Sequence, residues 1–296
     1  MIRIHFIVNP IAGHGHAPLT KEELQPYFIS GVHDLTIKIT EYKAHATLLT
    51  QESVLEKADI IVACGGDGTI NEVATCLIGT NIALGIVPMG SGNGLASNLK
   101  IPKNRRKALE IIRNKNKDHI DVGSINGRYF FSNTGVGFDA RLIKHYESSE
   151  KRTLLGYISA CATTFRDIKK NEPLSIGIDG DTPMINPFIV LISNSNEMGY
   201  KLSLTPKASL QDGKLDVLVI KKINRLKMLW LGILILIRKV HWLKESKSFQ
   251  TTKLHLTRNH SDFFDTQVDG EHNRIDTNQL DISILEKSLC VLTANN

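Results

Sequence analysis

The segment GGDGTINE, from Gly65 to Glu72, decides how we interpret this chain. It follows a continuous apolar run, Asp59 to Cys64, and precedes a helix-like stretch from Ile70 to Leu77. Glycines in such a turn permit a tight backbone with exposed N–H groups, and the following helix directs its positive end toward the same space. The segment therefore predicts a site for phosphate oxygens.

Two side chains in this segment add chemistry. Asp67 supplies a carboxylate that could hold Mg²⁺ directly or through water, and Thr69 could cap the helix or contact phosphate. The plain alternative is a strand-to-helix turn in which Asp67 serves only as the cap. The order of all eight residues favours a functional site.

Two further glycine clusters also follow predicted strands: PMGSGNGLA (Pro88–Ala96) and NPIAGHG (Asn9–Gly15). Turns at neighbouring strand ends can face one ligand, although each cluster alone could be an ordinary flexible turn. Gly90, Gly92 and Gly94 do not match GxGxxG, which disfavours a hydride-transfer cofactor, and GxxxxGK[ST] is missing. We therefore expect a phosphate cradle that is neither a dinucleotide fold nor an ordinary P-loop.

The first part of the chain alternates apolar strand-like runs with helix-like stretches. This pattern predicts a doubly wound α/β domain with a parallel sheet covered on both faces. We expect this domain to span residues 1–118, with residues 286–296 returning to its sheet through the apolar run Leu289–Leu292. The predicted strands are Ile2–Val8, Leu35–Thr40, Asp59–Cys64 and Ile82–Val87, with a helix at Ala44–Lys57.

From residue 119 to 285 the chain shows short strand-like runs with turn signals, such as Asn126-Gly127. Such a pattern predicts an antiparallel, β-rich, sandwich-like second domain. Helical patches interrupt it at Ala140–Tyr146 and Leu154–Ile168. The predicted strands are Ile120–Ile125, Arg128–Ser132, Leu174–Ile178, Pro187–Ser193, Leu215–Ile220, Lys253–Thr257, Phe263–Val268 and Leu280–Leu285.

Two acidic turns of this second domain are candidates for chemistry. Asp212 precedes a predicted strand in Gln211-Asp212-Gly213-Lys214, and Glu271 ends the turn Asp269-Gly270-Glu271. Asp-Gly is the commonest hairpin signal, so each turn has a purely structural alternative. As functional groups, Glu271 could be a general base and Asp212 a metal ligand.

The run from Leu226 to Ile237 is nearly all apolar and has basic flanks. It is too short to span a bilayer, which needs roughly twenty residues. The run predicts either a buried core helix or, given Trp230 and Trp242, a segment at a membrane surface or lipid pocket.

Composition limits the cellular setting. Four scattered cysteines without a CxxC pair argue against a zinc site or a disulfide framework and favour a reducing cytoplasm. The N-terminus MIRIHFIVNP lacks the features of a secretion signal. The net charge of +6 is compatible with nucleotides, anionic membrane surfaces or nucleic acid and does not choose among them. Beyond this charge, no aromatic-basic motif indicates nucleic acid binding.

Taken together, these motifs resemble the diacylglycerol kinase catalytic-domain family, which includes bacterial diacylglycerol kinases, related lipid kinases and sphingosine kinases. The resemblance covers nearly the whole chain. It rests on VNPIAGHG, GGDGTINEV, PMGSGNGLA, NTGVGFDA (Asn133–Ala140), TPKASLQDGKLDV (Thr205–Val217) and VDGE (Val268–Glu271).

The resemblance implies an N-terminal nucleotide-binding domain, a β-rich lipid-binding domain and ATP in a cleft between them. It places the proton acceptor at Glu271, and a structural Mg²⁺ on the Asp212 side chain and the backbone carbonyls of Ser209 and Lys214. Nucleotide contacts would fall on Asn9, Gly13, Thr40, Gly65, Gly66, Asp67, Gly68, Thr69, Ile70, Asn71 and Ser91.

One departure leaves two questions open. Many bacterial diacylglycerol kinases have Thr-Ala/Gly-Asn-Asp where this chain has Ser91-Gly92-Asn93-Gly94, a variant closer to sphingosine-kinase-like members. The acceptor is therefore either a diacylglycerol or a sphingoid-type lipid. In those relatives the base is placed at the position of Asp67, so Asp67 competes with Glu271 for that role.

We thus expect an ATP- and Mg²⁺-dependent lipid kinase that is cytoplasmic and peripheral at the membrane. Its expected partner is a lipid substrate, with no nucleic acid partner, and a homodimer is a possible assembly. One rival function is a NAD or sugar kinase-like phosphotransferase, which the apolar, basic-flanked segment and the DGE-bearing β-rich half weaken. The other is a non-catalytic lipid-binding protein on a kinase scaffold, which the intact Asp67, Glu271 and glycine loops weaken.

Overall fold

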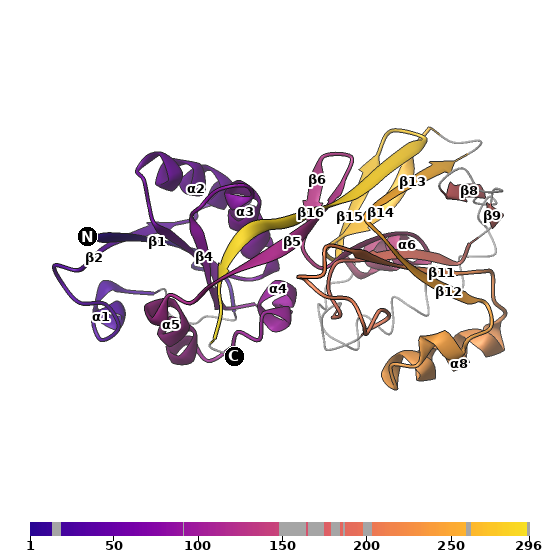
Figure 1. The fold of residues 1–296 in the computed structure, drawn as a ribbon, viewed down its shortest axis with the longest axis horizontal. Helices are drawn as coiled ribbons and strands as arrows, with labels where there is room; N and C mark the ends of the chain where they lie inside the picture. The colour runs from indigo at the N-terminus through magenta and orange to yellow at the C-terminus, as the bar shows by residue number, and fades with distance from the viewer. Residues whose placement is uncertain are drawn as a thin grey trace. The chain divides into compact units, whose positions relative to one another are not determined.

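A computed structural model describes residues 1–13, 19–90, 92–147, 164, 175–178, 184–185, 187–197, 203–258 and 262–294 (Figure 1). The chain forms two compact units. Unit 1 comprises Met1–Asp121 and Glu286–Asn296, and unit 2 comprises Val122–Leu285.

Unit 1 contains a parallel sheet in the order β2-β1-β3-β4. Its central strands are buried along almost their whole length, which is why the sequence shows continuous apolar runs rather than alternation. The strands are β1 (Ile2–Val8), β2 (His33–Ile39), β3 (Ile60–Gly65) and β4 (Ala83–Pro88).

Helices cover both faces of this sheet: α2 and α3 lie on one face and α1 and α5 on the other (Figure 1). The predicted doubly wound α/β domain is therefore confirmed. The helices are α1 (Lys21–Leu24), α2 (His45–Leu55), α3 (Asp67–Leu77), α4 (Gly94–Asn98) and α5 (Arg105–Asn114).

The strand order has a functional consequence. The chain moves outward from β1 to β2 and then returns across β1 to β3, so the direction of winding reverses between β1 and β3. In open α/β sheets, ligands bind beyond the carboxyl ends of the strands at such a reversal. The loops after β1 and β3 are therefore the place to look for a site in unit 1.

Unit 2 contains a six-stranded sheet in the order β12-β11-β10-β7-β14-β15, and every neighbouring pair in it is antiparallel. This confirms the predicted antiparallel, β-rich second part. The strands are β7 (Asn133–Gly137), β10 (Ile189–Ser193), β11 (Leu215–Ile220), β12 (Ser246–Thr251), β14 (Phe264–Val268) and β15 (Glu271–Ile275).

Alternating side chains of this sheet enter two separate cores. Val190 and Val217 pack with Leu254 and Ile282 in a sandwich core. The intervening Leu191 and Leu218 point to the opposite face. The strands that supply the rest of the sandwich are β5 (Lys117–Ile125), β6 (Arg128–Phe130), β8 (Ser175–Ile178), β9 (Met184–Ile185), β13 (Lys253–Arg258) and β16 (Gln279–Leu292).

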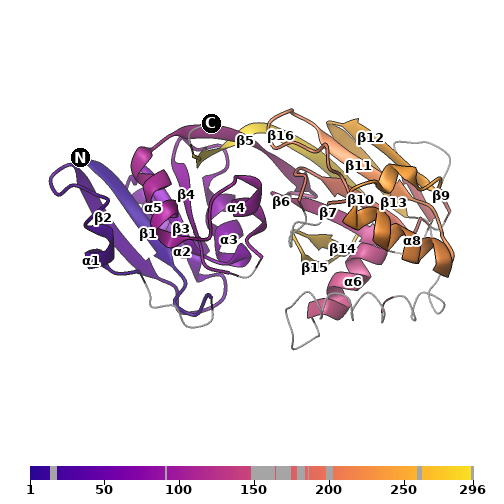
Figure 2. The same cartoon turned by 90° about the horizontal axis from the view of Figure 1, so that it is seen from below.

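Helices cover the outer face of the six-stranded sheet (Figure 2). They are α6 (Phe138–Glu147), α8 (Arg225–Leu236) and the short helix η2 (Val240–Trp242). In the described part of the chain, no helix combines the length and apolar character that crossing a membrane requires.

Several elements differ from what the sequence predicts. Helix α3 begins at Asp67 rather than Ile70, so Gly68 and Thr69 belong to its first turn. The predicted strand Leu280–Leu285 and the apolar run Leu289–Leu292 form the single strand β16. The polar residues between them continue the strand, with Lys287 at a positive φ of 47°. Strands β7, β12 and β15 were not predicted, since glycines or polar residues dilute their apolar pattern.

Val291 of β16 pairs in parallel with Leu84 of β4, so the last apolar run joins the sheet of unit 1. The helical patch predicted at Leu154–Ile168 lies outside the described residues, apart from Thr164.

Candidate functional site

The carboxyl edge of the unit 1 sheet brings three loops together. Asn9 follows β1 and donates its backbone N–H to Cys64 O at 2.9 Å. Thr40 follows β2 and donates to Val8 O at 2.9 Å, and Met89 follows β4 and donates to Gly65 O at 2.8 Å. Each loop is thus tied to the neighbouring strand at the point where it leaves the sheet.

The N-terminus of α3 lies at this edge. Gly66 is its N-cap residue, in extended conformation and without a side-chain cap. The N–H groups of the first helical turn, Asp67 to Thr69, have no carbonyl one turn earlier in the helix to bond with. Such a turn attracts anions, through both its N–H groups and the helix dipole. A hydrogen bond of 3.2 Å from Asn9 Nδ2 to Thr69 Oγ1 connects the loop after β1 to the first turn of α3.

The Asp67 carboxylate binds the second glycine loop. Its Oδ2 accepts from the backbone N–H of Asn93 at 2.8 Å, and its Oδ1 accepts from that of Gly94 at 2.5 Å. Asn93 is the N-cap of α4, so Asp67 satisfies N–H groups at the start of that helix. The side chain predicted as a metal or phosphate organiser therefore joins two successive glycine-rich turns at helix N-termini.

Close backbone approach explains the glycines of these turns. A Cβ on Gly90 would lie 2.7 Å from Gly66 Cα, a contact that backbone atoms cannot relieve by rotation. A Cβ on Gly92 would lie 2.6 Å from Asp67 Oδ2. The two turns therefore pack against each other with no room for a side chain on Gly90 or Gly92.

Asn93 is a positioning residue that the sequence reasoning missed. It is buried and adopts a left-handed conformation with φ of 56°, which asparagine tolerates better than most residues. Its Oδ1 accepts from Gly90 N at 3.0 Å and its Nδ2 donates to Gly90 O at 2.6 Å. An asparagine between two glycines, as in Gly92-Asn93-Gly94, was the available signal for such a turn.

The other predicted nucleotide contacts vary in their setting. Gly13 lies in the loop after β1 with φ of 77°, and Thr40 is buried at the end of β2. Ile70 is fully buried and its N–H already donates to Gly66 O at 3.0 Å. Asn71 lies in the helix α3. Ser91 lies outside the described residues.

In unit 2, the DGE segment forms a tight hairpin between β14 and β15. Val268 pairs with Glu271, so Asp269 and Gly270 make a two-residue turn, with φ values of 49° and 82°. Positive φ at both positions is typical of a type I′ turn.

The Asp269 carboxylate fixes this hairpin to the start of β7. It accepts three consecutive backbone N–H groups, from Phe131 at 2.8 Å, Ser132 at 2.7 Å and Asn133 at 3.1 Å. Asp269 N donates in return to Asn133 O at 2.9 Å. The buried Gln267 adds a bond from its Nε2 to Asn133 Oδ1 at 2.6 Å. The sequence reasoning identified the DGE turn but not this role of Asp269.

Glu271, in contrast, is exposed at the start of β15. Within the described part of the chain, its carboxylate accepts no hydrogen bond, whereas both oxygens of Asp67 are occupied. The hairpin therefore presents the Glu271 carboxylate to solvent on a rigid support.

The Asp212 turn presents a second group of carboxylates. Asp212 Oδ1 accepts from Lys214 N at 3.1 Å, and Gln250 Nε2 contacts Asp212 Oδ2 at 3.3 Å and Asp216 Oδ2 at 3.1 Å. Burial raises the pKa of Asp216, the bond from Gln250 opposes this rise, and the Asp212 charge adds to it. Two adjacent carboxylates suit a hard cation such as Mg²⁺.

No cluster of three or more His, Cys, Asp or Glu side chains suited to a metal occurs among the described residues. The predicted set, one Asp212 carboxylate with the carbonyls of Ser209 and Lys214, is not a cluster of that kind.

Two family models match this chain. The diacylglycerol kinase catalytic domain matches residues 3–125. The YegS C-terminal NAD kinase beta sandwich-like domain matches residues 132–283.

Curated relatives agree with these matches. A diacylglycerol kinase of Bacillus subtilis (strain 168) is 30% identical over 229 residues, covering 76% of this chain and 75% of the relative. A diacylglycerol kinase of Staphylococcus aureus (strain NCTC 8325 / PS 47) is 27% identical over 229 residues, covering 75% of this chain and 71% of the relative.

Solved structures show the same fold. A crystal structure from Bacillus anthracis str. Sterne superposes with a TM-score of 0.75 and 24% identity, covering 99% of this chain and 95% of that chain. The crystal structure of a diacylglycerol kinase from the same strain gives a TM-score of 0.69 and 21% identity, with 99% and 97% covered. At these identities, the likeness concerns the fold alone.

Proposed function

Because this chain belongs to the diacylglycerol kinase catalytic-domain family, we propose that it is an ATP-dependent lipid kinase. The proposed reaction transfers the γ-phosphate of ATP to the primary hydroxyl of a diacylglycerol or a sphingoid-type lipid. Residues 1–118, with 286–296, form the proposed ATP-binding part, and residues 119–285 the proposed lipid-binding part.

The observation that supports this proposal is the pair of glycine-rich turns at helix N-termini joined by Asp67. The first turn of α3 and the loop before α4 are held together by hydrogen bonds of 2.8 and 2.5 Å. Phosphate oxygens of ATP would accept N–H groups of these turns. Fixed donors of this kind stabilise the charge on a transferring phosphoryl group without having to reorganise.

Glu271 is the proposed general base. It would accept the proton of the lipid hydroxyl while the hydroxyl oxygen forms a bond to the γ-phosphorus. The bond between that phosphorus and the bridging oxygen breaks, and ADP leaves with the electron pair. Asp67 is the weaker candidate for the base, because both its oxygens accept backbone N–H groups in unit 1.

Mg²⁺ fits the Asp212 turn by its donor set: an exposed carboxylate, the adjacent Asp216 and nearby backbone carbonyls. We propose the Asp212 side chain with the carbonyls of Ser209 and Lys214 as its ligands. A cation bound there supplies charge neutralisation and order to the turn. The chain's own part is to hold Asp212 in place, through Lys214 N and Gln250.

The decisive experiment incubates the pure protein with labelled ATP and a panel of acceptors: diacylglycerol, sphingosine, NAD and a hexose. Label in one lipid supports the proposal and identifies the acceptor. Label in NAD or the sugar would replace it with another phosphotransferase. ATP binding without transfer to any lipid would indicate a non-catalytic lipid-binding protein.

A substitution tests the base. Glu271→Gln should lower kcat by about 10²-fold or more at saturating substrates, a range typical of general bases. Glu286→Gln, an exposed carboxylate change elsewhere in the chain, is the matched control. A Glu271→Gln enzyme with the parental kcat would remove Glu271 from this role.

The proposed setting follows from the acceptor. A lipid substrate resides in a membrane, so we propose that the enzyme works peripheral at a membrane surface, on its cytoplasmic side. Cys64, Cys76 and Cys290 are free thiols, in keeping with a reducing compartment. We propose no nucleic acid partner, and a homodimer stays a prediction.

A further inference from the structure

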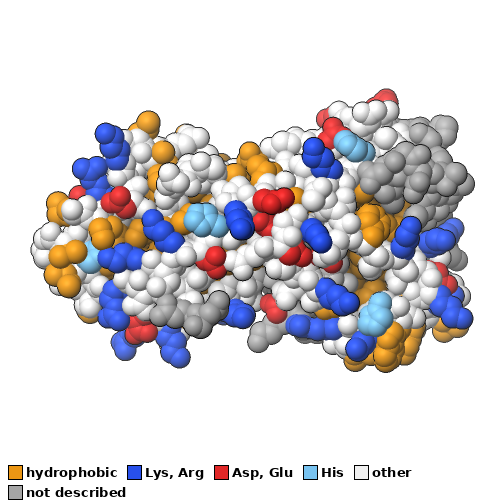
Figure 3. All heavy atoms as spheres, viewed as in Figure 1, with side chains coloured by type: hydrophobic (Ala, Val, Ile, Leu, Met, Phe, Trp, Pro, Cys, Tyr) orange, Lys and Arg blue, Asp and Glu red, His pale blue; other side chains and the backbone are white. Residues whose placement is uncertain are grey.

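Helix α8 presents an apolar face to solvent. Leu226, Leu229 and Leu236 keep 77%, 71% and 73% of their surface exposed, and Trp230 and Ile233 are also exposed. Figure 3 shows hydrophobic side chains gathered at the surface over this helix, with Lys and Arg side chains beside them. Contiguous exposed apolar patches are uncommon on soluble monomers and mark surfaces of interaction.

The positions of these residues follow the helical repeat. At roughly 100° per residue, they fall within an arc of about 120° on one side of α8. The buried Leu231 and Leu234 lie outside this arc and pack against Leu191 and Leu218 of the sheet. The fold therefore needs only one face of the helix to be apolar. The second apolar face has no role in the core.

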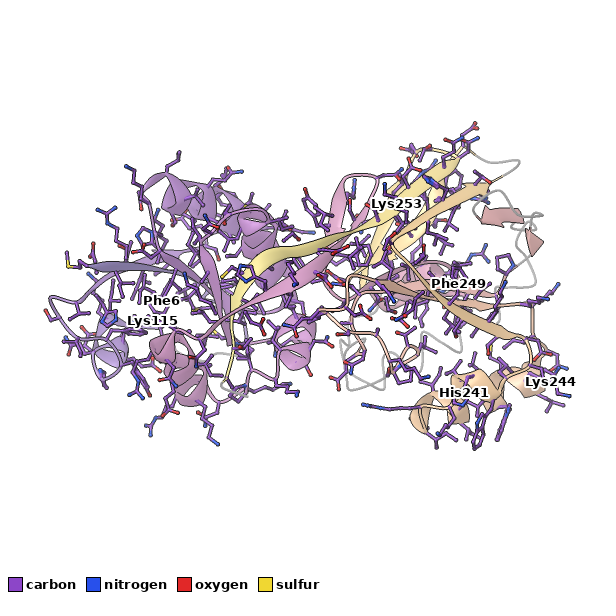
Figure 4. The ribbon with its side chains drawn as sticks, viewed as in Figure 1. Phe6, Lys115, His241, Lys244, Phe249 and Lys253 are labelled. Carbon is purple, nitrogen blue, oxygen red and sulfur yellow. The ribbon has the colours of Figure 1, made fainter. Side chains whose placement is uncertain are left out.

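Basic residues lie before and after the apolar run of α8 in the sequence. From Lys221 to Lys244, both included, the sequence contains seven Lys or Arg and no Asp or Glu. Lys221, Lys222, Lys239 and Lys244 are exposed. His241 and Lys244 lie next to α8 (Figure 4). The surface thus combines apolar and positively charged groups.

Tryptophan marks the same surface. The chain has two tryptophans, Trp230 on the apolar face and Trp242 just after the helix. Trp242 is 57% exposed, and Lys239 Nζ lies 5.9 Å from its ring centroid. Tryptophan is enriched at the level of lipid headgroups, where one end of the ring is apolar and the other wet.

These features identify the partner. We propose that the α8 surface, defined as Leu226, Leu229, Trp230, Ile233, Leu236 and the basic residues between Lys221 and Lys244, docks on an anionic phospholipid bilayer. A helix of this kind lies in the interface plane with its apolar face among the headgroups and upper acyl chains. Lys and Arg next to it attract the anionic headgroups.

A second copy of this chain fits the surface less well. In a two-fold symmetric dimer the same patch forms both sides of the contact, so the basic clusters would face each other. Like charges in juxtaposition disfavour a complex. An anionic membrane supplies the opposite charge together with an apolar interior.

The test uses the full-length protein and vesicles of phosphatidylcholine alone or with about 30% phosphatidylglycerol. The two kinds of vesicle differ in anionic lipid, which the basic residues of the α8 surface should attract. Sedimentation measures binding. Trp230 belongs to the α8 surface and Trp242 lies just after the helix, and the chain has no other tryptophan. A blue shift of their emission and quenching by brominated lipid therefore report insertion of this surface directly. We expect both signals with anionic vesicles and much weaker ones with phosphatidylcholine.

Leu229→Gln combined with Leu236→Gln should weaken vesicle binding at least about tenfold, because two exposed apolar side chains leave the bilayer. The matched control is Leu48→Gln with Leu55→Gln, two exposed leucines of α2. Lys239→Gln with Lys244→Gln should weaken binding mainly at low salt. Lys43→Gln with Lys107→Gln, both exposed, is its control.

Three results would overturn the proposal: no binding to anionic vesicles, equal loss in the α2 control, or a dimer in sedimentation velocity that the α8 leucine variant dissociates. The inference adds to the proposed function, but its test does not depend on it. If the protein binds vesicles through α8 but phosphorylates no lipid, only the proposed kinase activity is contradicted. If the protein phosphorylates a dispersed short-chain lipid but does not bind vesicles, only the proposed docking of the α8 surface is contradicted.

Discussion

Asp67 and Gly94, 27 residues apart in sequence, are joined by a 2.5 Å hydrogen bond from the Gly94 backbone N–H to the Asp67 carboxylate. Together with the bond from Asn93 N, it connects the βα turn after β3 to the turn after β4. Both turns end in helix N-termini, where phosphates bind favourably. The carboxylate therefore holds together the two turns that we propose as the phosphate site.

We predict that Asp67→Ala weakens ATP binding and destabilises unit 1. The N–H groups of Asn93 and Gly94 would lose their acceptor, at a cost of about 1–3 kcal/mol for each group that stays buried. A loss of about 1.4 kcal/mol of binding free energy is a tenfold rise in Kd, and we expect at least that in calorimetric titration with ATP.

Two variants sharpen this test. Asp67→Asn keeps one oxygen acceptor and should fall between wild type and Asp67→Ala. Glu110→Gln neutralises an exposed carboxylate of α5 and should leave Kd unchanged. Wild-type ATP affinity in Asp67→Ala would show that the two turns keep their spacing without the carboxylate.

The second prediction concerns Gly90. In Gly90→Ala the new Cβ would meet Gly66 Cα at 2.7 Å, so the two turns must separate. We expect a destabilised protein with weakened ATP binding. Gly232→Ala is the matched control: nothing lies within 4 Å of its added Cβ, and in a helix alanine is favoured over glycine by about 0.5–1 kcal/mol. Calorimetry and thermal unfolding measure both; equal behaviour of the two variants would contradict the packing argument.

The architecture of unit 1 was predictable because its information is local. Buried parallel strands such as β3 are continuous apolar runs, and Gly65-Gly66 ends that run where the strand ends. Unit 2 was predictable as antiparallel, but not in every strand. β7 has two glycines in five residues and is held by pairing with β10 and β14 on both sides, which no local pattern reveals.

The site was predictable in its residue types but less so in its contacts. GGDGT and SGNG each indicate a phosphate turn, yet only the fold shows Asp67 of one turn binding the other. Likewise, the sequence predicts only that Asp269 belongs to an Asp-Gly hairpin turn. The three backbone N–H groups that donate to its carboxylate belong to residues more than 130 positions earlier. Contacts of such separation depend on the tertiary fold.

Asp269 gives the third prediction. Asp269→Ala would leave three consecutive N–H groups of Phe131, Ser132 and Asn133 without their acceptor and release the hairpin that carries Glu271. We expect a loss of stability of several kcal/mol by urea unfolding, since each orphaned buried group costs about 1–3 kcal/mol. If the proposed kinase activity stands, kcat should fall while Kd for ATP is kept, because the hairpin belongs to unit 2. A matched change is Asp276→Ala, an exposed acid bound to Arg274 in the same unit.

The fourth prediction concerns pH and His5. This side chain is only 4% exposed in β1, and burial lowers its pKa from 6.5, partly offset by the Glu56 carboxylate at 3.4 Å. The unfolded chain therefore binds a proton on His5 more readily than the folded one. Stability from His5 is complete above the unfolded pKa and is lost as pH falls through the folded pKa.

We expect native-state hydrogen exchange of the β1 amides to show a lower free energy of opening at about pH 5.5 than at about pH 7.5, because protonation of His5 favours the unfolded chain across this window. The difference should shrink in His5→Gln, whose side chain does not titrate. His5→Phe is a second variant, used in case the buried amide of His5→Gln prevents folding. His119→Gln, an exposed histidine of the same unit, should keep the wild-type difference. An undiminished difference in both His5 variants would assign the pH dependence to another group, because only the side chain that carries the shifted pKa can remove it when replaced.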